Sequence, residues 1–345
     1  MKHAIFFISF IFAALFLSHL NRTQDGADVT NSKPVLRVFG YSSFTGKWGP
    51  GPLLKDEFEK TCNCQIEFID GSDSGILLQR LKIEGESLGV DMIIGLDQFD
   101  LAKAQAEHSW RKIKTDGISF EPPIISFTKL DSFLPYDWGV MAFVSRKGGA
   151  PLTKLDDVVS EAWKGKIAFQ DPRTSSPGMQ FLSWIFDAKR ENAEEYLQKV
   201  FSTAHSFSPT WSGSYGLFSK KQVDVVFSYV TSPLYHQIEE KDDNYMAHRF
   251  AEAHPIQVEF FGIPDFCKNC DLAENFAALL LSPQGQKIIM EKNYMFPVVQ
   301  GIRQGTPFDI VENFPIQSQV PDINQQRVDE MIRTWSILRR GDKQR

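Results

Sequence analysis

The chain has 345 residues, which is enough for one large domain or for two lobes with separate cores. Apolar residues make up 42% of the chain and charged residues 23%, as is ordinary for a soluble globular protein. The formal net charge of −6 leaves no basic excess for neutralising phosphates, which argues against a nucleic-acid-binding protein.

The first segment of the chain has the form of a secretory signal peptide. Met1-Lys2-His3 is short and basic, residues 4–17 (AIFFISFIFAALFL) are apolar, and polar sequence follows. The apolar run is shorter than the roughly 20 residues that span a bilayer as a helix. We therefore expect a signal peptide at 1–20, a polar linker at 21–33 and a folded part outside the cytoplasm. An uncleaved membrane anchor is the alternative.

After the linker, short apolar strands alternate with amphipathic helices. The pattern predicts strands at 35–39, 65–69, 90–94, 140–145, 166–170, 223–229 and 257–261. It predicts helices at 51–60, 74–86, 177–189, 272–281, 283–292 and 324–340. Strands that alternate with helices in this way are typical of an α/β fold with mainly parallel sheets.

The four cysteines form two local pairs, Cys62 with Cys64 and Cys267 with Cys270. In an exported protein an even number of cysteines favours disulfides. The case is weaker for the C-x-C pair, because its bridge closes a strained ring. Zinc binding by the four cysteines is possible in principle, but no histidine ligands lie nearby.

Polar and aromatic residues follow several of the predicted strands. In open α/β sheets, ligands bind outside the carboxyl ends of the strands. The stretches at these ends are 40–44 (GYSSF), 70–75 (DGSDSG), 95–97 (GLD), 171–178 (DPRTSSPG) and 229–233 (YVTSP). We therefore expect the binding site at this edge.

Two of these stretches also begin helices, which leaves their roles open. Ser175 and Ser176, before Pro177, could hold an anion or hydroxyl at a helix start, or could merely cap the helix. Ser232 has the same two interpretations. Asp73 could be a ligand carboxylate or the N-cap of the helix at 74–86.

Three aromatic residues stand out as possible faces for a flat or cationic ligand. They are Trp211, in a polar, glycine-containing stretch, and Tyr235 and Tyr294. Each of them could instead serve only in packing. The chain contains no G-x-G-x-x-G, Walker A or H-E-x-x-H pattern, and its histidines lack metal-ligand spacing. We expect no cofactor and no metal site, with ferric iron held by tyrosinates as a weak alternative.

Several segments together resemble the bacterial periplasmic thiamine-binding proteins, the soluble components of thiamine ABC importers. The resemblance runs in order from about residue 34 to 335. It rests on residues 41–44, 48–52, 62–64, 77–85, 95–97, 170–178, 215–218, 228–236, 239–245 and 295–298.

The resemblance implies a two-lobed, type II periplasmic-binding fold with the ligand between the lobes. We expect lobe 1 to comprise 34–137 and 262–345, and lobe 2 to comprise 138–261. The lobes should close on the ligand about a hinge near 258–264.

The family's ligand residues fall on Tyr41, Trp48, Asp73, Ser175, Trp211, Tyr229 and Tyr235. Beside them we place Ser74, Ser176, Ser232 and Tyr294. Two positions depart from the family pattern: Ser74 stands where the family has Gly, and Tyr294 stands where the family has Trp.

The resemblance further implies a monomeric periplasmic protein that captures thiamine or its mono- or diphosphate and has permease and ATPase partners. It implies no enzymatic activity and no nucleic-acid partner. The alternatives are a binder of ferric iron, a polyamine or another cation, and a thiamine-degrading transferase on the same fold. Such a transferase needs a nucleophile in its site, typically an activated cysteine.

Overall fold

The computed structural model describes residues 33–342, apart from 116, 310–313 and 318–323. The predicted signal peptide and all of the linker except its last residue lie outside the described residues. Within the described part, no helix combines the length and the apolar character needed to cross a bilayer.

Lobe 1 is built on three parallel strands, with β1 between β2 and β3. The strands are β1 (Val35–Gly40), β2 (Gln65–Asp70) and β3 (Met92–Asp97). The helices between and after them are α2 (Ser42–Thr45), α3 (Gly51–Cys62), α4 (Ser74–Glu84) and α5 (Leu101–Glu107). The expected helix at 51–60 and the expected strands at 35–39 and 65–69 are confirmed.

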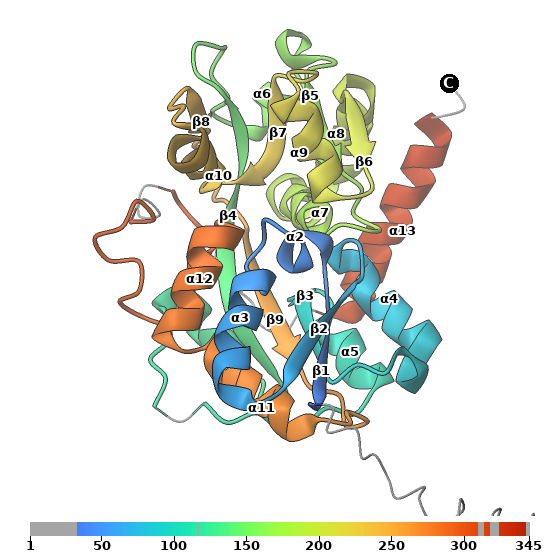
Figure 1. Cartoon of the computed structure of the whole chain (residues 1–345). Helices are drawn as coiled ribbons and strands as arrows, with labels where there is room; N and C mark the ends of the chain where they lie inside the picture. The colour runs from blue at the N-terminus through green and yellow to red at the C-terminus, as the bar shows by residue number, and fades with distance from the viewer. Residues whose placement is uncertain (1–32, 116, 310–313, 318–323, 343–345) are drawn as a thin grey trace, which may run out of the picture. The chain divides into compact units, whose positions relative to one another are not determined.

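Two long strands join the lobes, β4 (Phe133–Arg146) and β9 (Ile256–Gly262). They pair with each other in antiparallel fashion, and the sheet order is β2-β1-β3-β9-β4-β7-β5-β6. The parallel pairs therefore lie on the outer sides, whereas the central pairs are antiparallel. Because β4 pairs with β9 along its first half and with β7 along its second, it belongs to both lobes (Figure 1).

The predicted bounds differ most from the structure for two strands. The strand expected at 140–145 begins at Phe133, because the residues from Phe133 onward are already buried between neighbouring strands. The strand expected at 90–94, just before Gly95, instead runs from Met92 to Asp97. Gly95 has φ +104° and lies at a shift in register between β3 and β9, so it bends the strand without ending it.

Lobe 2 contains four further strands, which are β5 (Ile167–Gln170), β6 (Ser206–Ser208), β7 (Val225–Tyr229) and β8 (Tyr245–Ala247). Its helices are α6 (Leu155–Val158), α7 (Ser176–Lys189), α8 (Ala193–Thr203), α9 (Trp211–Ser219) and α10 (Ser232–Tyr235), the last continued by a π-turn at His236–Glu240. Short 3₁₀ segments occur at Gly85–Leu88, Pro122–Lys129, Glu161–Trp163 and Arg190–Asn192. Since separate apolar clusters lie on the two sides of the joining strands, each lobe has its own core.

The C-terminal part contains α11 (Cys270–Leu280), α12 (Pro283–Asn293), β10 (Phe296–Pro297) and α13 (Gln325–Asp342). Helices α11 and α12 pack against α3 in lobe 1. Helix α13 instead packs on α7 and α8, where Val328, Met331 and Trp335 join the core of lobe 2. We expected α13 to belong to lobe 1, as part of 262–345, but it packs on lobe 2. The apolar side of the helix is buried there against the core of lobe 2. The lobe boundaries themselves stay a prediction.

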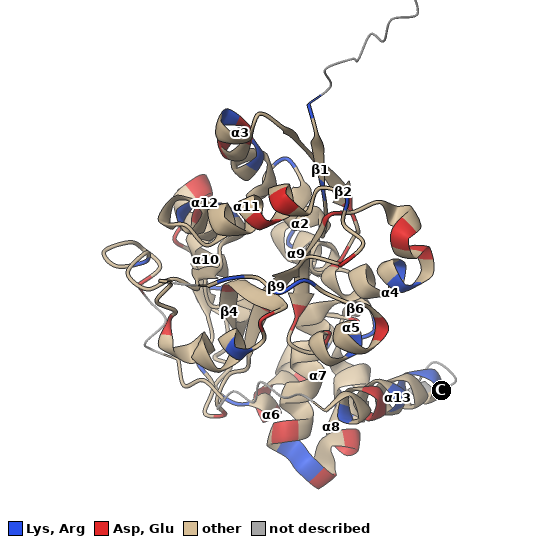
Figure 2. Ribbon diagram, turned by 90° about the horizontal axis from the view of Figure 1, so that it is seen from below, with Lys and Arg blue, Asp and Glu red and all other residues tan. Residues whose placement is uncertain are grey.

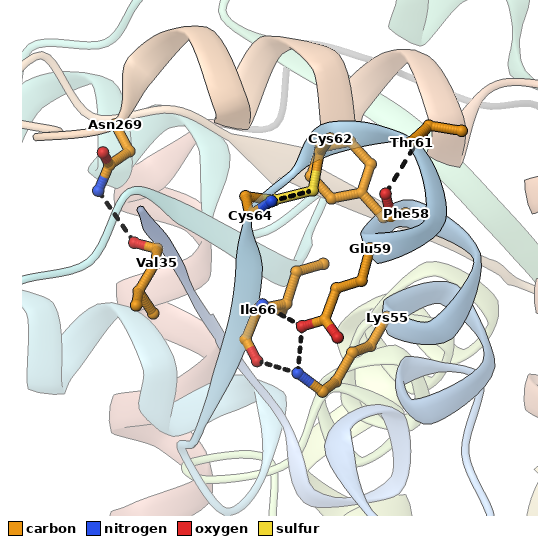
Figure 3. The surroundings of a disulfide bond; sticks show 9 residues. All are labelled: Val35, Lys55, Phe58, Glu59, Thr61, Cys62, Cys64, Ile66 and Asn269. Carbon is orange, nitrogen blue, oxygen red and sulfur yellow. Dashed lines mark hydrogen bonds and ion pairs between the residues drawn. A yellow bond between two sulfur atoms is a disulfide. The ribbon is translucent and has the colours of Figure 1, made fainter. Parts of the chain in front are cut away.

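All four cysteines are in disulfides, Cys62–Cys64 and Cys267–Cys270. The C-x-C bridge forms at the end of α3, where Asn63 turns in the left-handed region with φ +48°. Figure 3 shows that Lys55 and Glu59 lie beside it, where their side chains bond the backbone of Ile66 in β2. These contacts join the helix to the edge strand.

Charged residues of both signs lie along outer helices such as α3, α8 and α13 (Figure 2). Most of the ion pairs in the described residues involve at least one exposed side chain, as in Arg37–Glu67 and Lys112–Asp131. Such pairs contribute little to stability. The carboxyl groups buried inside the molecule are a different case.

Candidate ligand-binding site

Two direct hydrogen bonds between predicted ligand residues join the lobes where α4 meets α7 and α9. The amide N–H of Trp211 donates to Asp73 Oδ2 at 2.9 Å. The hydroxyl of Ser74 donates to Ser176 Oγ at 2.8 Å. The residues in each pair are more than 100 positions apart in the sequence. The fold thus brings together the two helix starts that sequence analysis selected.

Asp73 does not act as a helix cap, although it occupies the N-cap position of α4. Its carboxylate makes no cap bond to its own helix and reaches the first residue of α9 in the other lobe. Burial raises the pKa of Asp73, and the hydrogen bonds from Trp211 and Ser74 oppose that shift. Asp73 is therefore a buried acid between the lobes.

The Ser175 side chain likewise does not cap its helix, α7. It occupies the N-cap position of α7 without a side-chain cap bond. Its hydroxyl is close enough to lower the pKa of Asp73, yet it makes no hydrogen bond of good geometry with any residue that the structure describes, and Ser175 is only 1% exposed. A buried hydroxyl without a partner is costly, so Ser175 is suited to bonding a ligand.

Asp97 brings a second carboxyl group to the same junction. Burial raises its pKa to about 6, while the hydroxyl of Ser176 and the amide N–H of Phe99 favour its ionised form. The negative charge of Asp73 raises the pKa of Asp97 further. Asp97 lies in the third stretch of the strand-end search.

The ring of Trp211 stacks on Tyr215, with ring centroids 4.8 Å apart and planes at 25°. Its indole N–H donates to Ser228 Oγ at 3.0 Å, and Ser228 bonds Ser232 at 2.8 Å. Trp211 and Ser232 are thereby joined through Ser228. Both positions are fixed by contacts within lobe 2.

A column of rings continues behind Tyr215. The ring of Tyr215 is nearly parallel to that of His236, which in turn stacks on Tyr245 at 3.5 Å. His236 Nε2 bonds the Tyr215 hydroxyl at 2.9 Å, and its Nδ1 bonds Glu240 at 2.7 Å. Sequence analysis did not assign this supporting role to Tyr215, His236 or Tyr245, because only the fold places these positions in one stack.

Tyr235 and Tyr294 meet edge to face, with ring centroids 5.5 Å apart and planes at 82°. The Tyr294 hydroxyl donates to Glu239 Oε1 at 3.1 Å, and Thr231 Oγ1 donates to the Tyr294 carbonyl at 2.5 Å. Tyr294 has φ +53° just after α12, an uncommon conformation for a bulky residue. These contacts bring the C-terminal part of the chain to lobe 2.

Tyr41 and Tyr229 lie beside a second group of acids. The Tyr41 hydroxyl donates to Glu259 Oε2 at 2.6 Å and accepts from Asn293 Nδ2 at 2.8 Å. Tyr229 is partly buried, and its hydroxyl makes no hydrogen bond within the part of the chain that the structure describes. Its pKa is raised by burial first, and then by Glu259, Asp137 and other acids.

Trp48 is the predicted residue that the structure leaves apart from the others. Its side chain is 83% exposed, and its ring contacts the Lys47 ammonium at 5.0 Å from the centroid.

A surface hollow of about 640 Å³ lies between α3 and α12, but no predicted ligand residue lines it. Its lining residues are Leu53, Asp56, Glu57, Glu59, Lys60 and Ile288.

Sequence analysis missed Asp137, Glu259 and Asn293. A signal existed for Glu259, because a charged residue in the middle of the apolar strand 257–261 must find a partner when buried. The amide N–H and phenol O–H groups that donate to Asp73, Asp97, Asp137 and Glu259 are all neutral. None of these four buried acids forms an ion pair with a cationic side chain among the described residues, and such a set favours a cationic ligand. The described residues contain no group of three or more His, Cys, Asp or Glu placed to hold a metal ion.

The sequence pattern of the family described as bacterial extracellular solute-binding protein matches residues 53–294. The chain belongs to this family. The thiamine-binding periplasmic protein of Salmonella typhimurium is 39% identical over 269 residues, which cover 77% of this chain and 82% of that protein. The Haemophilus influenzae protein of the same name is 38% identical over 327 residues, covering 90% and 93%.

Among solved structures, one described as a periplasmic thiamin binding protein superposes on this chain with a TM-score of 0.80. It is 33% identical in sequence, and the match covers 91% of this chain and 98% of that one. The two-lobed α/β fold implied by the resemblance is thereby confirmed.

Proposed function

We propose that this solute-binding protein captures thiamine, or thiamine mono- or diphosphate, in the periplasm and delivers it to an ABC-type importer. Its partners would be the permease and ATPase subunits of that importer, and it would act as a monomer. The names of the relatives support this proposal, since they are described as thiamine-binding periplasmic proteins.

The observation that carries the proposal is the set of buried carboxyl groups beside aromatic rings at the junction of the lobes. Thiamine has a permanently charged thiazolium ring and a flat aminopyrimidine. A cation inside a protein needs compensation, which Asp73 would supply. Tyr235 and Tyr294 would contact the flat ring, and ring faces also attract cations. Ser175 would bond the hydroxyl or phosphate tail.

The other predicted contacts complete the proposed site. Tyr41, Tyr229 and Trp211 would line it from the two lobes, with Ser74, Ser176 and Ser232 at the helix starts. Trp48 stays a proposed contact that depends on a movement of its exposed ring.

We propose that the protein performs no chemistry. A thiamine-degrading transferase would need a reactive thiol, whereas both disulfides together use all four cysteines of the chain.

The experiment is calorimetric titration of ligand-free protein with thiamine and its phosphates, after mass spectrometry of the ligand released from the purified protein. Asp73→Asn should weaken thiamine binding about tenfold or more, because a charge-assisted contact worth about 1.5 kcal/mol is lost. Asp70→Asn is the matched control, since Asp70 ends β2 just before the loop that carries Asp73, is exposed, and bonds only Ser42 and Ser72 through its side chain. If neither thiamine nor its phosphates bind the parent protein, the proposal is wrong.

A further inference from the structure

Two carboxyl groups face each other on the strands that join the lobes. Asp137 on β4 lies directly opposite Glu259 on β9 in the antiparallel register, which places both side chains on one face of the sheet. Asp137 is 0% exposed and Glu259 is 4% exposed. Like charges at directly opposed positions repel each other, and burial adds to the cost of ionising both.

The oxygens of Glu259 are satisfied by neutral donors. Tyr41 and Tyr136 donate their hydroxyls to Oε2 at 2.6 and 2.5 Å, and Gln257 Nε2 donates to Oε1 at 2.8 Å. These three bonds favour the ionised form of Glu259, although burial raises its pKa. Glu259 is thus the better-stabilised carboxylate of the two.

Asp137 is the less satisfied member of the pair. Asn293 Nδ2 donates to its Oδ2 at 2.7 Å, but its Oδ1 is buried and receives no hydrogen bond from any described donor. Burial, and then the negative charge of Glu259, raise the pKa of Asp137 well above its usual range. Since the two residues are directly opposed in the register and each affects the pKa of the other, one proton held between them would satisfy the free oxygen.

The surroundings of the pair contain acids and phenols. The pKa of Tyr229 on β7 is raised by both members of the pair and also by Asp73, just before α4, and Asp97, at the end of β3. Tyr41 bonds Glu259 directly, and Asn293 bridges Tyr41 and Asp137. Since Tyr41 and Tyr229 are proposed ligand contacts, the pair lies immediately behind the proposed site.

We infer that Asp137 and Glu259 together hold one proton in the ligand-free protein and release it to solvent when a cationic ligand binds. The inference rests on the proposed function. A positive charge near the pair favours two ionised carboxylates, so the ligand takes over the compensation that the proton provides in the empty protein. By linkage, affinity for the cation rises with pH, by up to tenfold per pH unit while one proton is released.

Calorimetric titration with thiamine at pH 7 in buffers of different ionisation enthalpy counts the protons released. We expect a value approaching one for the parent protein and for the exposed control Asp70→Asn, and a value near zero for Asp137→Asn. Asp97→Asn tests a competing source of the proton, another buried carboxyl group at the junction, and it should leave most of the release in place.

Thiamine binding with no buffer dependence, or with the same release in Asp137→Asn, would overturn the inference and leave the proposed function standing. Absence of thiamine binding would instead refute the proposed function itself. If Asp137→Asn does not fold, infrared difference spectra of the parent protein decide. A protonated-carboxyl band must be present without ligand and disappear with thiamine, and its absence from the ligand-free protein refutes the inference.

Discussion

The hydrogen bond between Ser74 and Ser176 offers a sharp test of how the two lobes cooperate. Ser74→Ala removes the hydroxyl that donates to Ser176 across the junction at 2.8 Å and that also lies 3.2 Å from Asp73 Oδ1. The two residues are 6% and 2% exposed, so water does not replace the lost partner without a change in packing. Loss of one neutral buried hydrogen bond costs about 1 kcal/mol.

The loss of this hydrogen bond in Ser74→Ala should weaken ligand affinity and should leave the stability of each lobe unchanged. The bond joins residues of different lobes, so it exists only while α4 and α7 are together. If ligand binding requires that closed arrangement, a loss of about 1 kcal/mol raises the Kd about fivefold. When the lobes open in solution, the ligand-free protein lacks this hydrogen bond. Its unfolding temperature should therefore change by much less than a loss of about 1 kcal/mol implies.

The assay is calorimetric titration with thiamine, combined with thermal unfolding of the ligand-free protein. Ser202→Ala is the matched control, because Ser202 is exposed and bonds only the carbonyl of Lys199 within α8. The control should leave the Kd unchanged. An unchanged Kd in Ser74→Ala, or a loss that appears only in thermal stability, would refute the reasoning.

Two further predictions use residues on either side of the junction. Tyr294→Ala should weaken thiamine binding by on the order of 1 kcal/mol, whereas Tyr294→Trp should hold or improve it, since the larger ring keeps the contact with the ligand; equal binding by a folded Tyr294→Ala protein contradicts this. Burial lowers the pKa of His254 from 6.5 to about 4, and its Nδ1 donates to the Met141 carbonyl at 2.7 Å. Between pH 6.5 and about 4, the His254 side chain is protonated in the unfolded chain but neutral in the folded protein. The contribution of His254 to stability is therefore present above pH 6.5 and is lost as the pH falls toward 4. Urea unfolding at pH 7 and pH 5 should show a smaller loss for His254→Gln than for the parent, and equal losses would rule out this role.

The regular elements could be predicted from sequence because local patterns determine them. Alternation of apolar residues located β1, β2, β5 and β9 closely. The β4 boundary was less accurate, since burial between two neighbouring strands depends on the sheet order. The strand at 90–94 was predicted to end before Gly95, because a bulge within a strand and a strand end look alike in a single sequence.

The candidate site could be predicted only in part. A search at strand ends selected Asp73, Ser175 and Ser176, because residues at such ends share one edge of the sheet. Their partners in the other lobe could not be derived from spacing. The opposition of Asp137 and Glu259 was likewise hidden, since it depends on how two strands 122 positions apart align.

The most direct test of the central claim is a calorimetric comparison of thiamine with its isolated aminopyrimidine moiety, which lacks the thiazolium charge. A site built from buried acids and aromatic rings should bind thiamine with one-to-one stoichiometry and should bind the neutral fragment far more weakly. Equal affinity for the two compounds, or no saturable binding of thiamine, would contradict the account of a site that compensates a cation between the lobes.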